Sequence, residues 1–157
     1  MEPVFGGVYK LAAVEGPDGQ VIPKIKVSEN PVKITTPHFK KVYRLFANDT
    51  GKAEADLICV YDEVLDTTQP LELFDPDATW KRKTITDYTA VELLVPIFRD
   101  GKLVYHQPGI EEIRNYCAQQ VGLLWEEVKR FEFPHNYYVD LSQRLWQIKQ
   151  DLLNENQ

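Results

Sequence analysis

The chain has 157 residues and a formal net charge of -6, with 43% hydrophobic and 27% charged residues. Its 3 Trp, 8 Tyr and 7 Phe residues exclude a disordered chain, and its 2 cysteines are too few for a disulfide scaffold. Glu92 and Pro96 interrupt the best apolar run, which argues against a membrane span, and no secretory signal is visible at the first residues. We therefore expect a soluble, cytoplasmic globular protein.

The first two-thirds of the chain carry the patterns of strands and turns. Apolar or alternating runs predict strands at residues 8–14, 24–27, 42–46, 55–61 and 80–85. Turn signals follow at residues 15–19 and 48–51. The clearest hairpin joins residues 93–98 to 103–105 through Asp100 and Gly101, a pair that accepts the positive φ of a tight turn. Pro96 marks an edge strand or a bulge in that hairpin.

After residue 109 the spacing of apolar residues changes to three and four, which predicts helices. The first runs from Ile110 to Val128, with a kink or a split at Gly122. A last helix has Asp140 as its expected N-cap, with Gln143 at the third position. Its predicted buried stripe consists of Leu141, Leu145, Ile148 and Leu152. The sequence thus predicts an α+β fold with about six to eight short, largely antiparallel strands, followed by two or three C-terminal amphipathic helices.

The most suggestive local motif lies at residues 58–68, where Asp62 and Glu63 follow an apolar strand and Asp66, Thr67 and Thr68 follow them. This pattern resembles the phosphoribosyl-pyrophosphate loop of type I phosphoribosyltransferases, in which carboxylates hold ribose hydroxyls and backbone N–H groups hold the 5′-phosphate. The loop here has no glycine, and Pro70 lacks an N–H group. A strand entering an acidic turn is the favoured interpretation.

Other candidate sites have ordinary structural explanations. Asp75 and Asp77 resemble a metal-binding pair, but Asp-Pro-Asp is also a common turn. Cys59 and Cys117 are expected to be core thiols. The histidines and serines are scattered and lack the spacing of zinc sites or hydrolase elbows: His38, His106, His135, Ser28 and Ser142. We predict no metal site and no catalytic residue.

The basic residues are concentrated in one segment. Between residues 24 and 44 six basic residues face one acidic residue, which leaves -11 for the rest of the chain. With Tyr43 and Phe46 nearby, this segment could bind single-stranded nucleic acid as a small β module. The overall negative charge disfavours that function, and a solvated face or a contact with an acidic surface of the same protein is preferred.

Read as a whole, the sequence resembles the C-terminal portion of bacterial nicotinate phosphoribosyltransferases. The segments that carry the resemblance are 6–11, 23–31, 33–37, 41–44, 51–56, 80–83, 92–96, 124–127, 134–135 and 138–142. They span nearly the whole chain in order. His38 departs from the family, which usually has glycine after Thr-Pro.

The resemblance implies a role in NAD biosynthesis. The family joins nicotinate to phosphoribosyl pyrophosphate, with ATP and magnesium, through a phosphorylated histidine, and the whole enzyme is expected to be a homodimer. Its reactive histidine, substrate-binding arginines and phosphate loop lie in an α/β barrel upstream of Gly6, so no catalytic or substrate-binding residue maps here. Asp62, Glu63 and Thr67 are then a coincidental match, kept as an alternative phosphoribosyl-pyrophosphate site.

The resemblance also implies a domain division. We expect residues 1–15 to be the residual edge of the catalytic barrel, with Met1 an introduced start, and residues 16–157 to be the C-terminal domain. Within it, residues 16–108 are β-rich and 109–157 helical. The expected partner is the catalytic barrel of the same chain, with no nucleic acid and no membrane. The piece alone is expected to be inactive and to bind no cofactor.

Overall fold

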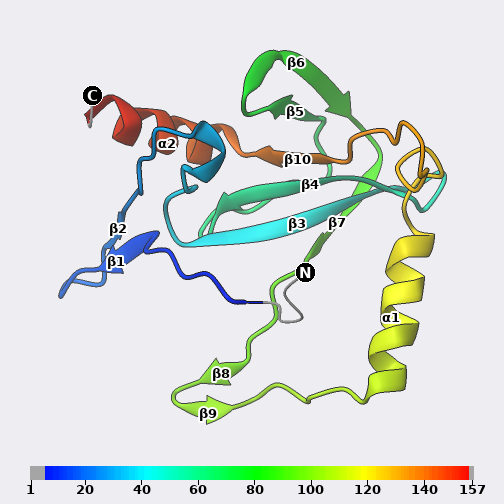
Figure 1. Cartoon of the computed structure of the whole chain (residues 1–157), viewed down its shortest axis with the longest axis horizontal. Helices are drawn as coiled ribbons and strands as arrows, with labels where there is room; N and C mark the ends of the chain where they lie inside the picture. Colours follow the sequence, from blue (N-terminus) through cyan, green and yellow to red (C-terminus); the bar gives the residue numbers. More distant parts are fainter. Residues whose placement is uncertain (1–5, 156–157) are drawn as a thin grey trace. The chain divides into compact units, whose positions relative to one another are not determined.

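The computed structural model describes residues 6–155, which form two compact units. One unit, here called the terminal unit, combines the residues up to Lys40 with those from Gln143 onward, and the other, the sheet unit, is Lys41–Ser142. Short, mostly antiparallel strands and two α-helices confirm the α+β class (Figure 1). Within residues 6–155 no helix has the length and apolar character needed to cross a membrane. The domain limits at residues 15 and 108 stay a prediction.

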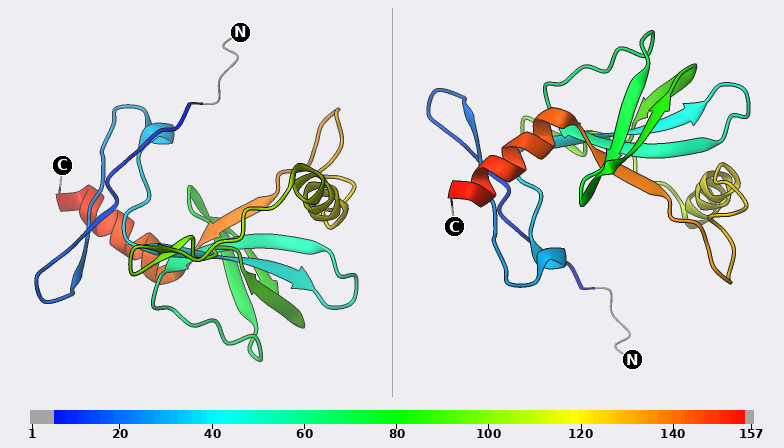
Figure 2. Two further views of the ribbon diagram at one scale, coloured as in Figure 1. Left: turned by 90° about the horizontal axis from the view of Figure 1, so that it is seen from below. Right: turned by 90° about the horizontal axis from the view of Figure 1, so that it is seen from above.

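A four-stranded sheet organises the sheet unit, in the order β10-β4-β3-β7. β3 (Lys40–Ala47) and β4 (Ala53–Val60) form the expected hairpin through the turn at residues 48–50. β7 (Tyr88–Glu92) runs antiparallel to β3, and β10 (Tyr138–Leu141) runs parallel to β4 at the other edge. β5 (Leu71–Asp75) and β6 (Ala78–Ile85) make a separate antiparallel hairpin. Figures 1 and 2 show this hairpin beside β10.

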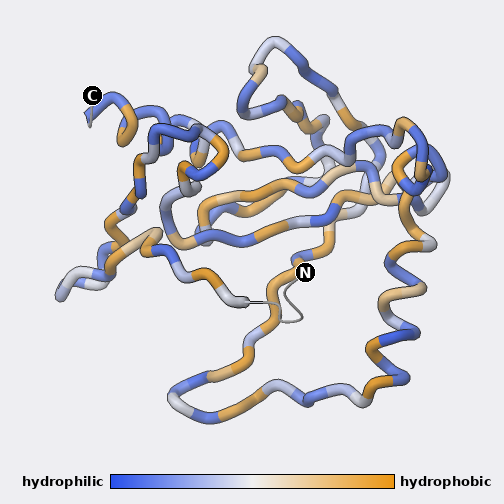
Figure 3. Tube along the Cα trace, in the orientation of Figure 1, coloured by the Kyte–Doolittle hydropathy of each residue, from blue (hydrophilic) through white to orange (hydrophobic). Residues whose placement is uncertain are grey.

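The core lies where one face of the sheet meets the β5–β6 hairpin. Because successive side chains of a strand alternate between faces, Ala55, Leu57 and Cys59 of β4 share one face. They pack in one cluster with Leu45 of β3 and Leu73 of β5, and all five are buried. Figure 3 shows the corresponding hydrophobic stretches along β3 and β4. This packing fixes β5 and β6 relative to the sheet and thereby positions β10 beside them.

Several predicted elements of the sheet unit are shorter than expected. The turn at Asp100 and Gly101 is confirmed, with φ of 48° and 73°, but its strands are only β8 (Phe98–Arg99) and β9 (Lys102–Leu103). Residues 93–97, Pro96 included, form no strand. α1 (Ile110–Gly122) stops at the glycine where the sequence predicted a kink or split. The chain from there to β10 has no helix.

In the terminal unit, β1 (Ala13–Glu15) and β2 (Val21–Pro23) form a short antiparallel hairpin. The predicted strand at 24–27 is wrong, because Lys26 N–H donates to Thr35 Oγ1 at 3.0 Å and so bonds a loop rather than a strand. Only the last residues of the predicted strand 8–14 are extended in β1. A short 3₁₀ turn, η1, covers Pro31–Lys33.

The last helix, α2 (Gln143–Glu155), carries three of the four residues of the predicted stripe, with Leu145 buried and Ile148 and Leu152 half-buried. The fourth, Leu141, belongs to β10 instead. The predicted N-cap is wrong. Asp140 belongs to β10, three residues before the helix begins, and is 3% exposed. Because two residues separate Asp140 from the start of α2, its side chain does not cap this helix. The carboxylate of Asp140 lies inside the sheet unit instead.

His38 adopts a backbone conformation that suits glycine. Its φ is 80°, in the left-handed region, and its N–H donates to Ala12 O at 2.7 Å. A side chain at such a φ costs about 1 kcal/mol or more. This geometry explains why a glycine would be the ordinary residue at this position.

We expect His38→Gly to be more stable than His38→Ala by about 1 kcal/mol, because both lose the imidazole and only alanine keeps the strained Cβ. The two free energies of unfolding can be compared by urea denaturation. If His38→Ala were instead the more stable of the two variants, the positive φ at His38 would add no measurable strain energy.

Candidate functional site

The acidic loop after β4 uses its carboxylates to hold its own backbone. Glu63 Oε2 accepts hydrogen bonds from Val60 N at 2.6 Å and from Ser142 Oγ at 2.8 Å. Asp66 Oδ1 accepts from Thr68 N at 2.9 Å and from Thr68 Oγ1 at 2.6 Å, and the Thr68 hydroxyl lowers the pKa of Asp66. Asp62 and Thr67 are exposed, and the chain continues into a strand rather than a helix. These contacts favour a structural role for the loop.

The Asp75-Pro76-Asp77 segment is the turn between β5 and β6. Asp75 Oδ1 accepts from the N–H groups of Asp77 and Ala78 at 2.9 and 3.1 Å, which is the pattern of an Asx turn. Across residues 6–155 no group of three or more His, Cys, Asp or Glu side chains is arranged to hold a metal ion. The geometry favours the turn over the metal pair.

The two cysteines differ. Cys59 is buried in the core, and burial raises the pKa of its thiol to about 12, so it stays protonated and unreactive. Cys117 lies exposed on α1, so its expected place in the core is wrong. The reason is that no residue of α1 is buried. His106 and His135 are also exposed.

Two of the six basic residues between 24 and 44 are used inside the fold. Lys40 Nζ donates to the carbonyl oxygens of Thr36, Pro37 and His38 at 2.9, 3.3 and 2.7 Å, and burial lowers its pKa. Arg44 forms a bidentate pair with Asp56, with both N···O distances 2.8 Å. These two residues are not part of a free basic surface, which weakens the case for nucleic-acid binding.

Arg44 and Asp56 are the centre of a polar cluster that was not predicted from the sequence. Tyr137 Oη donates to Asp56 Oδ1 at 3.0 Å, and Arg44 Nη1 donates to Gln120 Oε1 at 3.2 Å. Burial raises the pKa of Tyr137, and Asp56 raises the pKa of Arg44, so both stay protonated. The cluster ties β3 and β4 to α1 and to the segment before β10. Arg44 and Asp56 lie equally far from the hairpin turn, a cross-strand signal that could have revealed the pair.

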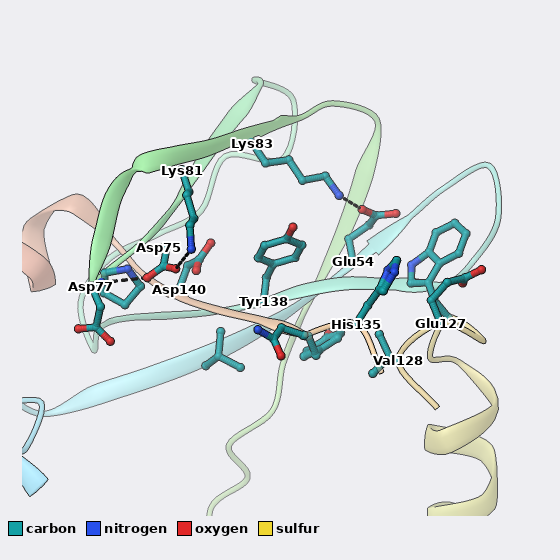
Figure 4. A pocket seen from close by; sticks show the side chains of 15 residues that line it. Glu54, Asp75, Asp77, Lys81, Lys83, Glu127, Val128, His135, Tyr138 and Asp140 are labelled. Atoms are coloured by element: carbon teal, nitrogen blue, oxygen red, sulfur yellow. Dashed lines mark hydrogen bonds and ion pairs between the residues drawn. The ribbon is translucent and has the colours of Figure 1, made fainter. Parts of the chain in front are cut away.

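A cleft of about 1050 Å³ lies in the sheet unit between β6, the edge strand β10 and the segment before β10 (Figure 4). Lys81 and Lys83 point into it from one face of β6, as residues two apart on a strand should. Tyr138 and Asp140 enter it from β10 in the same way. Its remaining lining residues are Glu54, Asp75, Pro76, Asp77, Trp125, Glu127, Val128, His135, Asn136, Tyr137 and Val139.

Two ion pairs lie in the lining of this cleft. Lys83 pairs with Glu54 and lies 5.8 Å from the centre of the Tyr138 ring, whereas Lys81 Nζ lies 3.7 Å from Asp75 Oδ2. Burial, and then the negative charge of Asp75, raise the pKa of Asp140 to about 6. The lining thus has mixed charges with a negative net charge, and it includes the aromatic residues Trp125, Tyr137 and Tyr138.

We expect Asp140→Asn to remove a pH-dependent destabilisation. In the unfolded chain the pKa of Asp140 is about 3.9, so in the wild type the folded state binds the proton of this carboxyl group more tightly. The free energy of unfolding therefore falls as pH rises from about 4 through 6. The stability advantage of the variant should therefore grow by about 2 kcal/mol across that window and stay constant above it. Urea unfolding from pH 4 to 8 measures it, with the exposed Asp77→Asn as control. A pH-independent difference would contradict the prediction.

An exposed apolar surface runs along α1 and the chain that leads to it; we call residues 94–121 the apolar arm. On α1 the exposed fractions of Ile110 and Ile113 are 75% and 50%, and on the hairpin those of Phe98 and Leu103 are 65% and 64%. Figures 1 and 3 show the arm extending from the sheet, with apolar segments along it. Exposed apolar surface of this kind is typical of interaction sites.

The family of this chain follows from comparison with known proteins. The model of the nicotinate phosphoribosyltransferase C-terminal domain matches residues 39–149. The nicotinate phosphoribosyltransferase of Bacillus subtilis (strain 168) is 41% identical over 154 residues, covering 98% of this chain and 31% of the relative. That of Homo sapiens is 32% identical over 145 residues, covering 92% of this chain and 26% of the relative.

The fold agrees with a solved structure. The crystal structure of human nicotinic acid phosphoribosyltransferase aligns with a TM-score of 0.66 and 24% identity, over 76% of this chain and 24% of that chain. The chain thus spans about a third or less of the length of these relatives. By the match over residues 39–149, the chain belongs to the family of nicotinate phosphoribosyltransferase C-terminal domains.

Proposed function

We propose that this chain is the supporting C-terminal domain of a nicotinate phosphoribosyltransferase and packs through its apolar arm against the catalytic barrel of the same protein. The whole enzyme would join nicotinate to phosphoribosyl pyrophosphate, coupled to ATP, and make nicotinate mononucleotide for NAD biosynthesis. It would be cytoplasmic and homodimeric. This chain would contribute no catalytic or substrate-binding residue, and Asp62, Glu63 and Thr67 would hold no substrate.

The exposure of α1 is the observation that carries the proposal. None of the 13 residues of α1 is buried, and several of its large apolar side chains are exposed. A helix of that length is marginal in water without a packing partner. The relatives are about three to four times as long as the matched region, so each supplies a large body that could cover this surface. Covering the arm would bury apolar area and stabilise both parts.

The residues described here do not suit ATP with magnesium. Magnesium with ATP is usually held by one or two carboxylates together with the phosphates, and the phosphates need positively charged or N–H donors that are free to bind them. The cleft has five acidic residues and two lysines, and each lysine already pairs with a carboxylate. These charges support the proposal that ATP and magnesium bind to the barrel.

A chimera tests the proposal. The segment of the Bacillus subtilis enzyme that matches this chain over 154 residues is replaced by this chain, and formation of nicotinate mononucleotide is measured. We expect the chimera to be active, and the truncated enzyme and this chain alone to be inactive. An inactive chimera that is folded by circular dichroism would overturn the supporting role.

Ligand binding to the chain alone separates the alternatives. Calorimetric titration with phosphoribosyl pyrophosphate should show no heat of binding. Micromolar binding that disappears in Asp62→Asn would instead assign the type I loop at residues 58–68. Fluorescence anisotropy with a single-stranded oligonucleotide at low salt should be flat, and salt-sensitive binding would favour the basic segment 24–44.

A further inference from the structure

Asp140 is a buried carboxylate without a counterion in the described structure. The residue is 3% exposed, yet no hydrogen bond or ion pair joins its side chain to any other residue of the described range 6–155. Figure 4 shows its carboxylate pointing from β10 toward the end of the cleft where Asp75 and Lys81 lie. No side-chain oxygen or nitrogen of residues 6–155 is both fully buried and without a hydrogen-bond partner, so the carboxylate of Asp140 keeps some contact with the solvent of the cleft. A carboxylate so far removed from bulk water favours a cationic partner.

The charges that face Asp140 favour a cation. Asp75 on β5 adds a second carboxylate, and Lys81 on β6 is the resident cation, 3.7 Å from Asp75 and largely exposed. Farther along the cleft, Lys83 is paired with Glu54. Five acids and two lysines leave three net negative charges on the lining. An anion would meet this negative field, whereas a cation would complete the Asp75–Asp140 pair.

The same residues argue against a bare metal ion. Asp75 and Asp140 are two carboxylates, and no third metal ligand joins them within the described residues. Asp75 Oδ1 is also committed to the N–H groups of Asp77 and Ala78. An organic cation needs fewer oxygen ligands, and it can place its carbon chain along the ring of Tyr138, which lies next to Asp140 in the cleft.

We propose that this cleft binds a guanidinium or alkylammonium group, which pairs with Asp140 and Asp75 and lies against Tyr138. The cation displaces Lys81 from Asp75. The group belongs either to a free organic cation or to an arginine or lysine side chain from the part of the longer protein that this chain does not span. Neither source adds a step to the reaction. The side-chain source rests on the proposed packing against the rest of the longer protein, whereas the free cation does not.

Titration of the whole chain with agmatine, which carries both cationic groups and no carboxylate, tests the proposal. We expect saturable millimolar binding at pH 7.5 by calorimetry and by shifts of the Tyr138 signals in NMR. Asp140→Asn, which keeps the side-chain shape, should weaken binding about tenfold or more. The matched control Asp77→Asn removes an exposed acid of the same cleft and should change affinity by no more than about twofold.

A further variant and a neutral ligand sharpen the result. Lys81→Met removes the resident cation and should tighten agmatine binding, whereas N-butylurea, which is uncharged, should not bind. Absence of saturable agmatine binding to the folded wild type, or equal weakening by Asp140→Asn and Asp77→Asn, would overturn the proposal. The second outcome would mean that the cleft attracts cations only through its overall charge.

The chimera distinguishes the two sources. If a side chain of the barrel fills the cleft, agmatine should bind this chain alone but not the chimera, and Asp140→Asn should destabilise the chimera more than Asp77→Asn does. If the ligand is a free cation, the chimera should bind agmatine as tightly as the isolated chain. Agmatine binding and nicotinate mononucleotide formation are measured separately, so the supporting role can fail while the cleft assignment stands.

Discussion

Replacing Arg44 with methionine is expected to lower the free energy of unfolding by about 3 kcal/mol, a large share of the stability of a domain of this size. The side chains of Arg44 and Asp56 are only 20% and 12% exposed, and they share two hydrogen bonds. Methionine fills most of the space but leaves Asp56 as a buried carboxylate whose remaining described partner is the hydroxyl of Tyr137. Urea denaturation followed by tryptophan fluorescence measures the loss.

A matched ion pair on the surface provides the control. Arg82 pairs with Glu72, and both side chains are about half exposed, so Arg82→Met should cost less than about 1 kcal/mol. Replacing both members of the buried pair, Arg44→Met with Asp56→Leu, should recover much of the loss because no unpaired charge remains. Equal effects of Arg44→Met and Arg82→Met would show that the buried pair adds nothing beyond a surface ion pair.

Local patterns predicted the parts of the fold that local physics decides. The alternation in β3, β4 and β6 and the glycine at the end of α1 were visible because period and turn chemistry act within a few residues. β10 was missed, because Tyr138–Leu141 pairs in parallel with β4, about eighty residues earlier in the chain. The long separation hid the strand, and its aspartate resembled a helix cap.

The candidate cleft could not be predicted for the same reason. The alternation of Lys81 and Lys83 placed both lysines on one face of a strand, but their opposing residues come from β10 and the segment before it. Asp140 acquires its significance from being buried beside Asp75, a contact between strands far apart in sequence. The family, by contrast, was predictable from the sequence, because the resemblance rests on many short segments in order and needs no three-dimensional contact.

The apolar arm leads to the prediction with the largest functional effect. In the active chimera, replacing both Ile110 and Ile113 by serine should lower nicotinate mononucleotide formation by about tenfold or more, because each buried isoleucine contributes roughly 1.5–3 kcal/mol to docking. The two residues are 75% and 50% exposed here, so the same change should leave the unfolding free energy of the isolated chain nearly unaltered. This contrast separates docking from folding.

Hydrogen exchange reports the docking without relying on activity. Amides of residues 110–122 should exchange fast in the isolated chain, because α1 buries none of its residues, and slowly in the chimera. The double serine variant should restore fast exchange there, whereas Glu112→Ser with Asn115→Ser, two exposed polar positions on the same helix, should not. Activity that survives the isoleucine changes, with α1 still protected, would mean that the barrel docks on another surface of this domain.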